Sequence, residues 1–495
     1  MKELKDLLEG VSNISVHGSL DIQISGVSAN SQTVRAGGLF IAKKGINSNG
    51  AKYIPDALNK GAAAILTDSF DSKHSQITQL VTTDIEDAEV LLASKFYGEP
   101  NQQLLMVGVT GTNGKTTTAY LIKYLLDNLR GLCGLIGTVE YHVGGCTIPA
   151  THTTPDATTN QQLLSNMVNS GAKFAVMEVS SHALVQGRVN GIDFDVAVYT
   201  NLSPDHLDYH QTMENYASAK NLLFRNMSNE RKDSYRFKSA VVNRDDPYVE
   251  SILAGCPVQT FSYGIDSDAD LVANDISFED GGTSFTLFYE GKCYSCHTPL
   301  IGRYNVYNTL AAIGVVLTQG YSIEDVVKLT PSLPPVPGRM EMVQNGLGLK
   351  IVVDFAHTAD ALENLLACVS EMKPERLITV FGCGGDRDRG KRPEMGRVSG
   401  KWSDISIVTS DNPRSENPLS IISEIVAGFG DNQKHLVEID REVAISKAIE
   451  VAKPQDVVVI AGKGHETTQT SSSQTIEFDD RKIVRKLCHA KQAAH

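Results

Sequence analysis

A lysine at the end of a glycine-rich turn carries the clearest chemical signal in this chain. Residues 110–117 read T-G-T-N-G-K-T-T, and the lysine is Lys115. The apolar run at 104–109 predicts a buried strand, and the pattern at 119–129 predicts an amphipathic helix. Between a strand and a helix N-terminus, glycines let backbone N–H groups approach a phosphate, whose charge a lysine neutralises. The stretch therefore predicts a nucleotide-binding site, and the threonine hydroxyls after the lysine could hold Mg²⁺.

This stretch departs from the strict phosphate-loop pattern, which places a glycine six residues before the lysine. That position is Val109, and the glycines stand instead at Gly108, Gly111 and Gly114. A purely structural glycine turn is the alternative. We favour nucleotide binding because Lys-Thr-Thr at the start of a helix is hard to explain as a structural turn.

Acidic and imidazole groups follow two further predicted strands. Glu178 ends an apolar strand predicted at 174–179, where a carboxylate could bind Mg²⁺; capping of the next helix is the alternative. Residues 201–210, N-L-S-P-D-H-L-D-Y-H, are dense in titratable groups and suggest a metal–phosphate site. Lys220 lies in a predicted helix, and by sequence alone it is expected on a solvated helix face.

Alternating strands and helices must position these groups. A chain of 495 residues corresponds to about three domains of ~150 residues. We expect an α/β protein with a small N-terminal domain (1–102) and a central, mostly parallel sheet of the phosphate-loop type with helices on both faces (103–337). A C-terminal Rossmann-like open sheet follows (338–495). The proline-rich residues 331–338 are expected to form a stiff linker.

The individual elements are predicted from hydrophobic periodicity. Further strands are predicted at 24–27, 39–42, 63–66, 132–136, 194–200, 240–242, 271–278, 283–289, 351–355, 377–381, 405–409 and 457–461. Further helices are predicted at 53–58, 86–96, 158–169, 216–224, 306–317, 362–372 and 421–429. Because open sheets bind ligands at the carboxyl ends of their strands, the loops 382–388, 410–414 and 461–466 are expected to share one crevice.

Composition excludes several classes of protein. The net charge is −13 without blocks of like charge, which argues against nucleic acid or an anionic membrane as the main partner. No apolar run approaches ~20 residues and no signal peptide is recognised, so we expect a cytoplasmic protein without a membrane span. Eight cysteines in so long a chain do not form a disulfide framework. Cys293 and Cys296 form a lone C-x-x-C, which we interpret as reduced thiols on a strand rather than a zinc site.

Several motifs in order resemble the ATP-dependent Mur ligases over nearly the whole chain. They are T-G-T-N-G-K-T-T, M-E-V-S-S-H at 177–182, T-N-L-S-P-D-H-L-D-Y-H at 200–210, N-x-x-N at 305–308, G-R-M-E at 338–341 and D-F-A-H-T at 354–358. D-N-P-R at 411–414 and G-K-G-H-E at 462–466 resemble the members that add diaminopimelate rather than lysine. The resemblance implies phosphorylation of a carboxylate by ATP, followed by attack of an amine on the acyl phosphate. The substrates would be UDP-N-acetylmuramoyl-L-alanyl-D-glutamate and meso-diaminopimelate, in peptidoglycan precursor synthesis, and the chain is expected to be a monomer.

The same resemblance assigns nucleotide and metal contacts. Those expected for ATP are Thr110, Gly111, Thr112, Asn113, Gly114, Lys115, Thr116, Thr117, Asn308, Arg339 and Asp354. The expected catalytic residues are Lys115, Glu178, His206 and Lys220. Two Mg²⁺ ions are expected, on Thr116, Glu178, His206 and Lys220, with Lys220 converted by CO₂ to a carbamate. This reverses the expectation for Lys220, because carbamylation needs a neutral, partly desolvated amine. His357 is expected near the phosphates without an assigned role.

Substrate contacts follow in the same way. The UDP precursor is expected at Ser31, Ile46, Asn47, Ser48, His152, Thr153, Thr154, Ser180, Gln186 and Arg188. His152 stands where related enzymes often have asparagine. Diaminopimelate is expected at Arg387, Asp411, Asn412, Pro413, Arg414, Gly462 and Glu466, with Arg414 gripping the far carboxylate. A folylpolyglutamate synthase-like ligase and a non-catalytic nucleotide-dependent switch are the alternatives.

Overall fold

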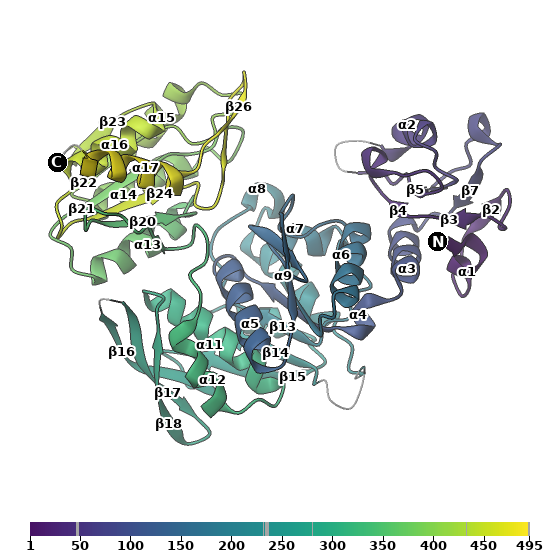
Figure 1. Ribbon diagram of the computed structural model, residues 1–495, viewed down its shortest axis with the longest axis horizontal. Coiled ribbons are helices and arrows are strands. Elements are labelled where there is room, and N and C mark those ends of the chain that lie inside the picture. Colours follow the sequence, from purple (N-terminus) through teal and green to yellow (C-terminus); the bar gives the residue numbers. More distant parts are fainter. Residues whose placement is uncertain (46–48, 231, 233–236, 280, 432, 494–495) are drawn as a thin grey trace.

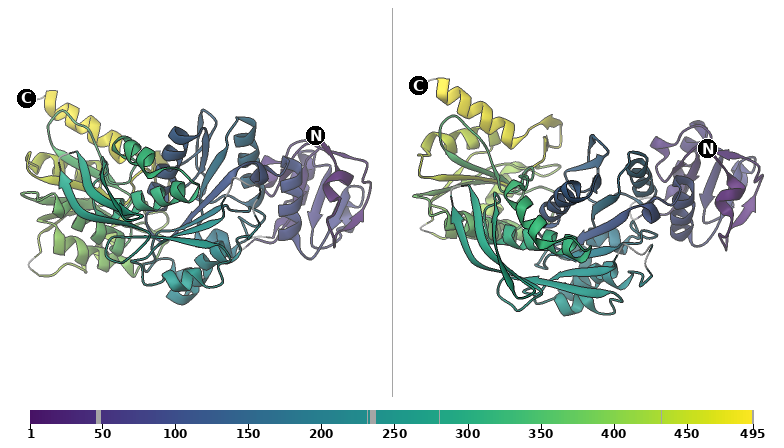
Figure 2. Two further views of the ribbon diagram at one scale, coloured as in Figure 1. Left: turned by 90° about the horizontal axis from the view of Figure 1, so that it is seen from below. Right: turned by 60° about the horizontal axis from the view of Figure 1, so that its bottom comes forward.

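Three lobes follow one another along the chain in a computed structural model, which describes residues 1–45, 49–230, 232, 237–279, 281–431 and 433–493. The lobes contain sheets of five, eleven and six strands. The first and third lobes lie at opposite ends of the central one (Figures 1 and 2). The predicted α/β class is confirmed, whereas the predicted boundaries at 102 and 337 stay predictions.

The first lobe is a small sheet covered by short helices. Its strand order is β2-β7-β6-β5-β4, with β2 antiparallel to β7 and the other pairs parallel. The predicted strand at 24–27 is two strands, β3 and β4. The elements are β1 (Lys2–Glu3), α1 (Leu4–Leu8), β2 (Ser15–His17), β3 (Gln23–Ile24), β4 (Val27–Ser28), β5 (Leu39–Ile41), α2 (Ile54–Asn59), β6 (Ala64–Thr67), β7 (Thr78–Val81), α3 (Ile85–Tyr97) and α4 (Pro100–Gln103).

The central lobe is organised around a buried parallel sheet. Strands β9, β12, β8, β13, β14, β15 and β16 pair in parallel, and antiparallel pairs extend both edges. Its strands are β8 (Leu105–Thr110), β9 (Cys133–Ile136), β10 (Glu140–Val143), β11 (Cys146–Pro149), β12 (Phe174–Glu178), β13 (Val196–Tyr199), β14 (Ser239–Asn243), β15 (Gln259–Gly264), β16 (Leu271–Glu279), β17 (Gly282–Tyr289) and β18 (Lys292–Thr298). Near-continuous Val, Ile, Leu and Ala in the inner strands fit a sheet that is buried on both faces.

Helices cover both faces of this sheet, as predicted. One hydrophobic core contains residues of α5, α11 and α12, and a second contains residues of α6, α7, α9 and α10. These helices are α5 (Lys115–Leu129), α6 (Ala157–Asn169), α7 (Ser181–Val185), α8 (Leu207–His210), α9 (Met213–Arg225), α10 (Val249–Leu253), α11 (Arg303–Thr318) and α12 (Ile323–Leu329). The parallel strands therefore all end at the edge that carries the phosphate loop.

The third lobe is an open sheet in the order β19-β20-β24-β21-β22-β23, parallel except for β19. Helices α13 to α15 pack on one face, and α16 and α17 on the other. The elements are β19 (Glu341–Met342), β20 (Lys350–Asp354), α13 (Ala359–Glu371), β21 (Leu377–Phe381), α14 (Lys391–Trp402), β22 (Ile405–Val408), α15 (Pro418–Val426), β23 (His435–Val437), α16 (Arg441–Val451), β24 (Val457–Ala461), β25 (Thr468–Thr470), β26 (Thr475–Glu477) and α17 (Asp480–Ala493).

The proline-rich segment, expected to be a stiff linker, is packed against the central lobe at two positions. Leu333 and Val336 are 2% and 1% exposed and belong to the core of the central lobe. Apolar side chains between the prolines thus anchor the segment by burial, which a composition-based interpretation overlooks. Cys293 and Cys296 lie on strand β18 as free thiols, which agrees with the predicted strand. Across the described ranges, no helix has the length and apolar character needed to cross a membrane.

Candidate functional site

The phosphate loop has the predicted strand–turn–helix geometry. Strand β8 ends at Thr110, and α5 begins at Lys115. Gly111 and Gly114 have φ of +145° and +85°, which favours glycine at both. A Cβ on Gly111 would lie 1.8 Å from Thr200 Oγ1, and one on Gly114 would lie 2.4 Å from Asn308 Oδ1. The loop therefore needs glycine at these two places for conformation and for space.

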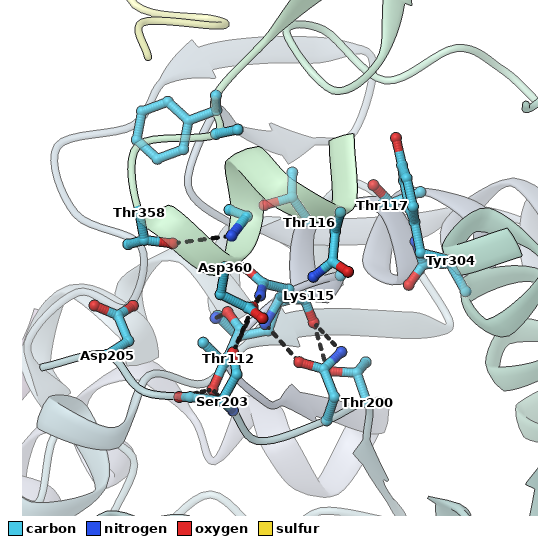
Figure 3. Close-up of a pocket in the computed structure, with 18 of the residues that line it drawn as sticks. Thr112, Lys115, Thr116, Thr117, Thr200, Ser203, Asp205, Tyr304, Thr358 and Asp360 are labelled. Atoms are coloured by element: carbon cyan, nitrogen blue, oxygen red, sulfur yellow. Dashed lines mark hydrogen bonds between the residues drawn. The ribbon is translucent and has the colours of Figure 1, made fainter. Parts of the chain in front are cut away.

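A cavity of about 590 Å³ opens at this loop, between the central and third lobes (Figure 3). Its walls come from both lobes, so a ligand here contacts both. The predicted nucleotide, metal and precursor residues that line it are Thr112, Asn113, Gly114, Lys115, Thr116, Thr117, Thr153, Glu178, Ser180, His206, Asn308, Arg339 and Asp354. His357, which had no assigned role, lines it as well.

Glu178 lies at the inner wall of the cavity and is completely buried. Its Oε2 accepts hydrogen bonds from Thr116 Oγ1 and Thr138 Oγ1, both at 2.9 Å. Its Oε1 accepts one from the Thr138 backbone N–H at 2.8 Å. The alternative of a helix cap does not hold, since the cap of α7 is Ser180. The carboxylate thus faces the first turn of the phosphate-loop helix.

Lys220 is buried, at 1% exposed, instead of lying on a solvated helix face. Its Nζ donates to Gly111 O at 2.7 Å and lies 4.5 Å from the centre of the Tyr216 ring. Lys115 Nζ donates to the same carbonyl at 2.8 Å, and to Thr112 O at 2.7 Å. Burial, reinforced by the charge of Lys115, lowers the pKa of Lys220 well below its usual value. The sequence expectation failed because helical periodicity does not reveal a buried polar position beneath a loop from another element.

Three histidines and two tyrosines form a ring cluster beside Lys220. His182 contacts His206, Tyr209 and His210, with ring centroids 4.8, 4.3 and 5.4 Å away. His210 stacks on Tyr216 at 5.0 Å. The side chain of His206 is 45% exposed, yet partial desolvation lowers its pKa to about 4, against the opposing charge of Asp205. A neutral imidazole has a free electron pair for a cation.

The third lobe contributes two charged groups that the motifs indicated. Arg339 donates from Nη2 to Thr116 Oγ1 at 3.3 Å, and its guanidinium lies 4.5 Å from the Phe355 ring centre. Asp354 accepts hydrogen bonds from the backbone N–H groups of Met340 and Ala356 at 2.6 and 2.7 Å. These contacts hold the start of the third lobe against the first turn of α5.

Asp360 was missed by sequence reasoning, although it lines the same cavity. Its Oδ2 accepts hydrogen bonds from Asn113 Nδ2 at 3.0 Å and from Ser203 Oγ at 2.7 Å (Figure 3). The bonds join α13 of the third lobe to two segments of the central lobe, the phosphate loop and the loop after β13. In the sequence, an aspartate in the first turn of a helix is usually explained by compensation of the helix dipole. Only its position shortly after the motif D-F-A-H-T could have indicated a role in the site.

Some of the predicted precursor residues form a hydrogen-bonded network at the end of β12, and the remaining ones lie outside this network. Thr154 Oγ1 donates to Glu178 O at 2.8 Å, and Arg188 Nη1 donates to Thr154 O at 3.0 Å. Arg188 also donates to Gln186 Oε1, at 2.6 and 3.0 Å. His152 is exposed, Ser31 lies in the first lobe, and Ile46, Asn47 and Ser48 fall outside the described residues.

The three loops predicted to share a crevice do meet at the carboxyl ends of the third sheet. Gly385 N donates to Asn412 O at 2.9 Å, and Arg414 Nη1 donates to Gly385 O at 2.7 Å. Asn412 Nδ2 donates to Glu466 Oε2 at 2.8 Å. Arg414 has a left-handed φ of +51°, which turns its side chain toward the glycine loop. Arg387 is exposed beside these loops.

One close contact links this group of loops to the start of the third lobe. Gly338 has φ +65°, and a Cβ there would lie 2.1 Å from His465 N and 2.3 Å from Gly464 C. His465 lies against Phe355, with ring centroids 5.0 Å apart. The loop after β24 therefore packs directly on the residue where the chain enters the third lobe.

The sequence and the structure are both similar to those of known ligases. Residues 23–94, 109–316 and 338–464 match the descriptions "Mur ligase family, catalytic domain", "Mur ligase middle domain" and "Mur ligase, glutamate ligase domain". A UDP-N-acetylmuramoyl-L-alanyl-D-glutamate–2,6-diaminopimelate ligase from Syntrophomonas wolfei is 42% identical over 490 residues, covering 98% of this chain and 99% of the relative. A solved structure with the same protein name is 34% identical, with a TM-score of 0.66 and 95% of each chain covered. The MurF ligase from Thermotoga maritima in complex with ADP shares the fold, at 21% identity, a TM-score of 0.66 and coverage of 95% of this chain and 98% of that one.

Proposed function

Because this chain belongs to the Mur ligase family, we propose that it joins meso-2,6-diaminopimelate to UDP-N-acetylmuramoyl-L-alanyl-D-glutamate at the expense of ATP. The cavity between the central and third lobes is where ATP and the carboxylate to be activated would meet. The observation that carries the choice of amine is the convergence of D-N-P-R and G-K-G-H-E in one group of loops, joined by the 2.8 Å bond from Asn412 to Glu466.

Activation of the carboxylate is the first chemical step of the proposal. A carboxylate oxygen attacks the γ-phosphorus of ATP, the bond to the ADP oxygen breaks, and an acyl phosphate forms. The chain's part is positioning and charge neutralisation, which dominate phosphoryl transfer. The N-terminus of α5, Lys115 and Arg339 would face the phosphates, since all three line the cavity. For this, Lys115 would exchange its bonds to Gly111 O and Thr112 O for phosphate oxygens.

Mg²⁺ fits the donor set at the inner wall. A buried carboxylate and a hydroxyl are hard oxygen ligands, and Glu178 with Thr116 supplies both, 2.9 Å apart. His206, neutral because of its low pKa, and Lys220 would hold a second ion. Bound Mg²⁺ would offset the negative charge that accumulates on the transferred phosphoryl group.

Carbamylation would give Lys220 the negative charge that this role requires. A neutral amine attacks the carbon of CO₂, an N–C bond forms, and one proton leaves. Burial and the neighbouring Lys115 favour the neutral amine, as the lowered pKa of Lys220 indicates. Two carbamate oxygens would then replace an ammonium in a site that already contains Lys115.

Amine attack on the acyl phosphate completes the reaction and releases phosphate. Arg414 would bind the far carboxylate of diaminopimelate, with Asp411 and Glu466 near its far ammonium. Lysine has no far carboxylate and would leave Arg414 without its partner, so it should be a poor substrate. The first lobe would hold the UDP end of the precursor, and division of the chain at 102 and 337 remains part of the proposal, as do a cytoplasmic location and a monomeric state.

The decisive experiment is an amine panel with ATP and the UDP-linked dipeptide. We expect phosphate release with diaminopimelate, and a kcat/KM at least about 10³-fold lower with lysine, as for a buried polar mismatch. Comparable turnover of both amines would refute the assignment. Turnover of folate with glutamate would support the folylpolyglutamate alternative, and ATP hydrolysis independent of both substrates would support a nucleotide-dependent switch.

A further inference from the structure

Lys463, the lysine of G-K-G-H-E, is completely buried in the group of loops that would receive the amine. A buried lysine is rare unless its charge is paired, because desolvation of an ammonium is costly. None of the contacts proposed above uses it. Its environment therefore needs an explanation of its own.

Three segments of the chain meet at the Lys463 ammonium. Its Nζ donates to Glu466 Oε2 at 3.0 Å, to Thr468 O at 2.7 Å and to Asn412 Oδ1 at 3.4 Å. These acceptors belong to its own loop, to strand β25 and to the D-N-P-R loop. An ammonium has three donors, and each is used on a different segment.

Asn412 closes the same unit from the opposite side. Its Nδ2 donates to Glu466 Oε2, and its Oδ1 also accepts from Thr470 N at 2.9 Å. Both ends of this amide are thus engaged within the protein. Among the residues that the structure describes, Glu466 is held through Oε2, and its side chain is 33% exposed. One carboxylate oxygen is fixed, and the other remains available to a ligand.

Strand β25 is attached to the D-N-P-R loop by two more bonds. Gln469 Nε2 donates to Asp411 O at 2.6 Å, and Arg414 N donates to Thr470 O at 3.0 Å. The β25–β26 hairpin therefore supports the backbone on both sides of Asn412. Displacing Thr468 would displace Asp411 and Arg414 with it.

We propose that Lys463 is a positioning residue for the amine substrate: it fixes Glu466, Asn412 and strand β25 in the arrangement that presents Arg414 to the far carboxylate and Glu466 to the far ammonium of the amino acid. This rests on the proposed function, because it names what orients the groups of that same site. Lys463 does not touch the substrate. Its charge also offsets that of Glu466, whose Oε2 lies 3.0 Å from its Nζ.

The test replaces Lys463 with methionine, which retains length and loses the charge and donors. We expect Lys463→Met to raise the KM for the amine at least about tenfold, as for loss of hydrogen bonds to a charged group. The KM values for ATP and for the UDP-linked dipeptide should stay within about twofold, because Lys463 and the groups it binds do not line the nucleotide cavity. Lys463→Arg, which keeps the charge and donors, should have an amine KM closer to that of the unmodified chain. Lys482→Met, which removes only the exposed pair with Glu477, is the matched control and should leave all three KM values unchanged.

The outcomes separate this inference from the proposed function. If the unmodified chain turns over an amine other than diaminopimelate, the proposed function is refuted. The KM values of the Lys463 variants are then measured with that amine as the substrate. An unchanged amine KM in Lys463→Met overturns the inference, as does a parallel loss of ADP and amine binding, which would indicate a merely structural role. If Lys463→Met shows no cooperative melting transition, Gln469→Ala decides: a raised amine KM with an unchanged ATP KM supports the positioning unit, and an unchanged amine KM overturns it.

Discussion

Lys115 and Lys220 donate to one acceptor, the carbonyl oxygen of Gly111, at 2.8 and 2.7 Å. Two ammonium groups on one carbonyl repel each other, and the repulsion disfavours the charged form of the more deeply enclosed amine. The phosphate loop and the helix that carries Lys220 are therefore electrostatically connected through a single peptide group. The proposed carbamate would turn this repulsion into attraction.

Lys220→Ala should abolish ligase activity, with a loss of at least about 10³-fold in kcat, because it removes a charge-stabilising group from the phosphoryl-transfer site. Phosphate release with both substrates measures the effect. Lys328→Ala, at an exposed position, is the control. Removal of CO₂ should lower the activity of the unmodified chain, and bicarbonate should restore it; full activity of Lys220→Ala would contradict the carbamate role.

Glu178→Gln should lower kcat by about 10²–10³-fold and raise the Mg²⁺ concentration that gives half-maximal activity, since it removes a buried negative charge from the predicted metal site. A Mg²⁺ titration of initial rates provides the measurement. Glu324→Gln, at an exposed position of α12, serves as the control. An unchanged Mg²⁺ dependence would exclude Glu178 as a metal ligand.

Asp360→Ala should raise the KM for ATP about tenfold, because it removes the charge-assisted bonds from Asn113 and Ser203 that join two lobes across the cavity. Asp360→Asn retains an acceptor oxygen and should have a smaller effect. Steady-state kinetics at saturating precursor and amine distinguishes the two variants. Equal KM values in both variants and in the unmodified chain would show that this contact does not contribute to nucleotide binding.

Arg414→Ala should raise the KM for diaminopimelate about 10²-fold, the expected effect of losing a charged hydrogen-bonding partner. Its effect on lysine, which has no far carboxylate, should be much smaller. The amine panel repeated with this variant measures both values. An equal loss for the two amines would mean that Arg414 supports the loop rather than selecting the substrate.

His465 should make stability depend on pH. Burial, followed by the charges of Arg339 and Arg481, lowers its pKa to about 3, whereas the unfolded chain has a value of about 6.5. On acidification, the unfolded state binds a proton at this histidine before the folded state does. The free energy of unfolding is therefore not reduced by His465 above pH 6.5, and it decreases as the pH falls from 6.5 toward 3. At pH 5 the loss amounts to about 2 kcal/mol. His465→Gln should flatten the pH dependence of the unfolding free energy between pH 7 and 5; an identical slope would refute the assignment.

Sequence motifs and hydrophobic periodicity predicted the positions of site residues correctly where those residues end or directly follow a strand. The phosphate loop, Glu178 at the end of β12 and the loops after the third sheet's strands all lie where strand–turn–helix reasoning placed them. That reasoning works because parallel strands end at a common edge, so a residue's place along a strand also defines its place in the site.

Burial of polar groups could not be predicted in the same way. The periodicity around Lys220 is compatible with either face of a helix, and what covers this lysine is Gly111, from more than a hundred residues earlier in the chain. Asp360 and Lys463 show the same limitation, because their roles depend on partners brought in from other segments. The family resemblance pointed to Lys220 as a functional residue. It included Lys463 within the motif G-K-G-H-E without assigning it a role, and it did not include Asp360.

The tight packing of Gly338 on the loop after β24 limits how the third lobe can swing. Residues just before this glycine are anchored in the central core through Leu333 and Val336, so the pivot is short. Gly338 and Gly464 are in mutual backbone contact, with a Cβ on Gly464 only 2.7 Å from Gly338 O. A rotation about this pivot must therefore drag the G-K-G-H-E backbone along with it. In the proposed function, a rotation that opens the cavity for ADP to leave would therefore also move the amine-binding loops away from the phosphate loop.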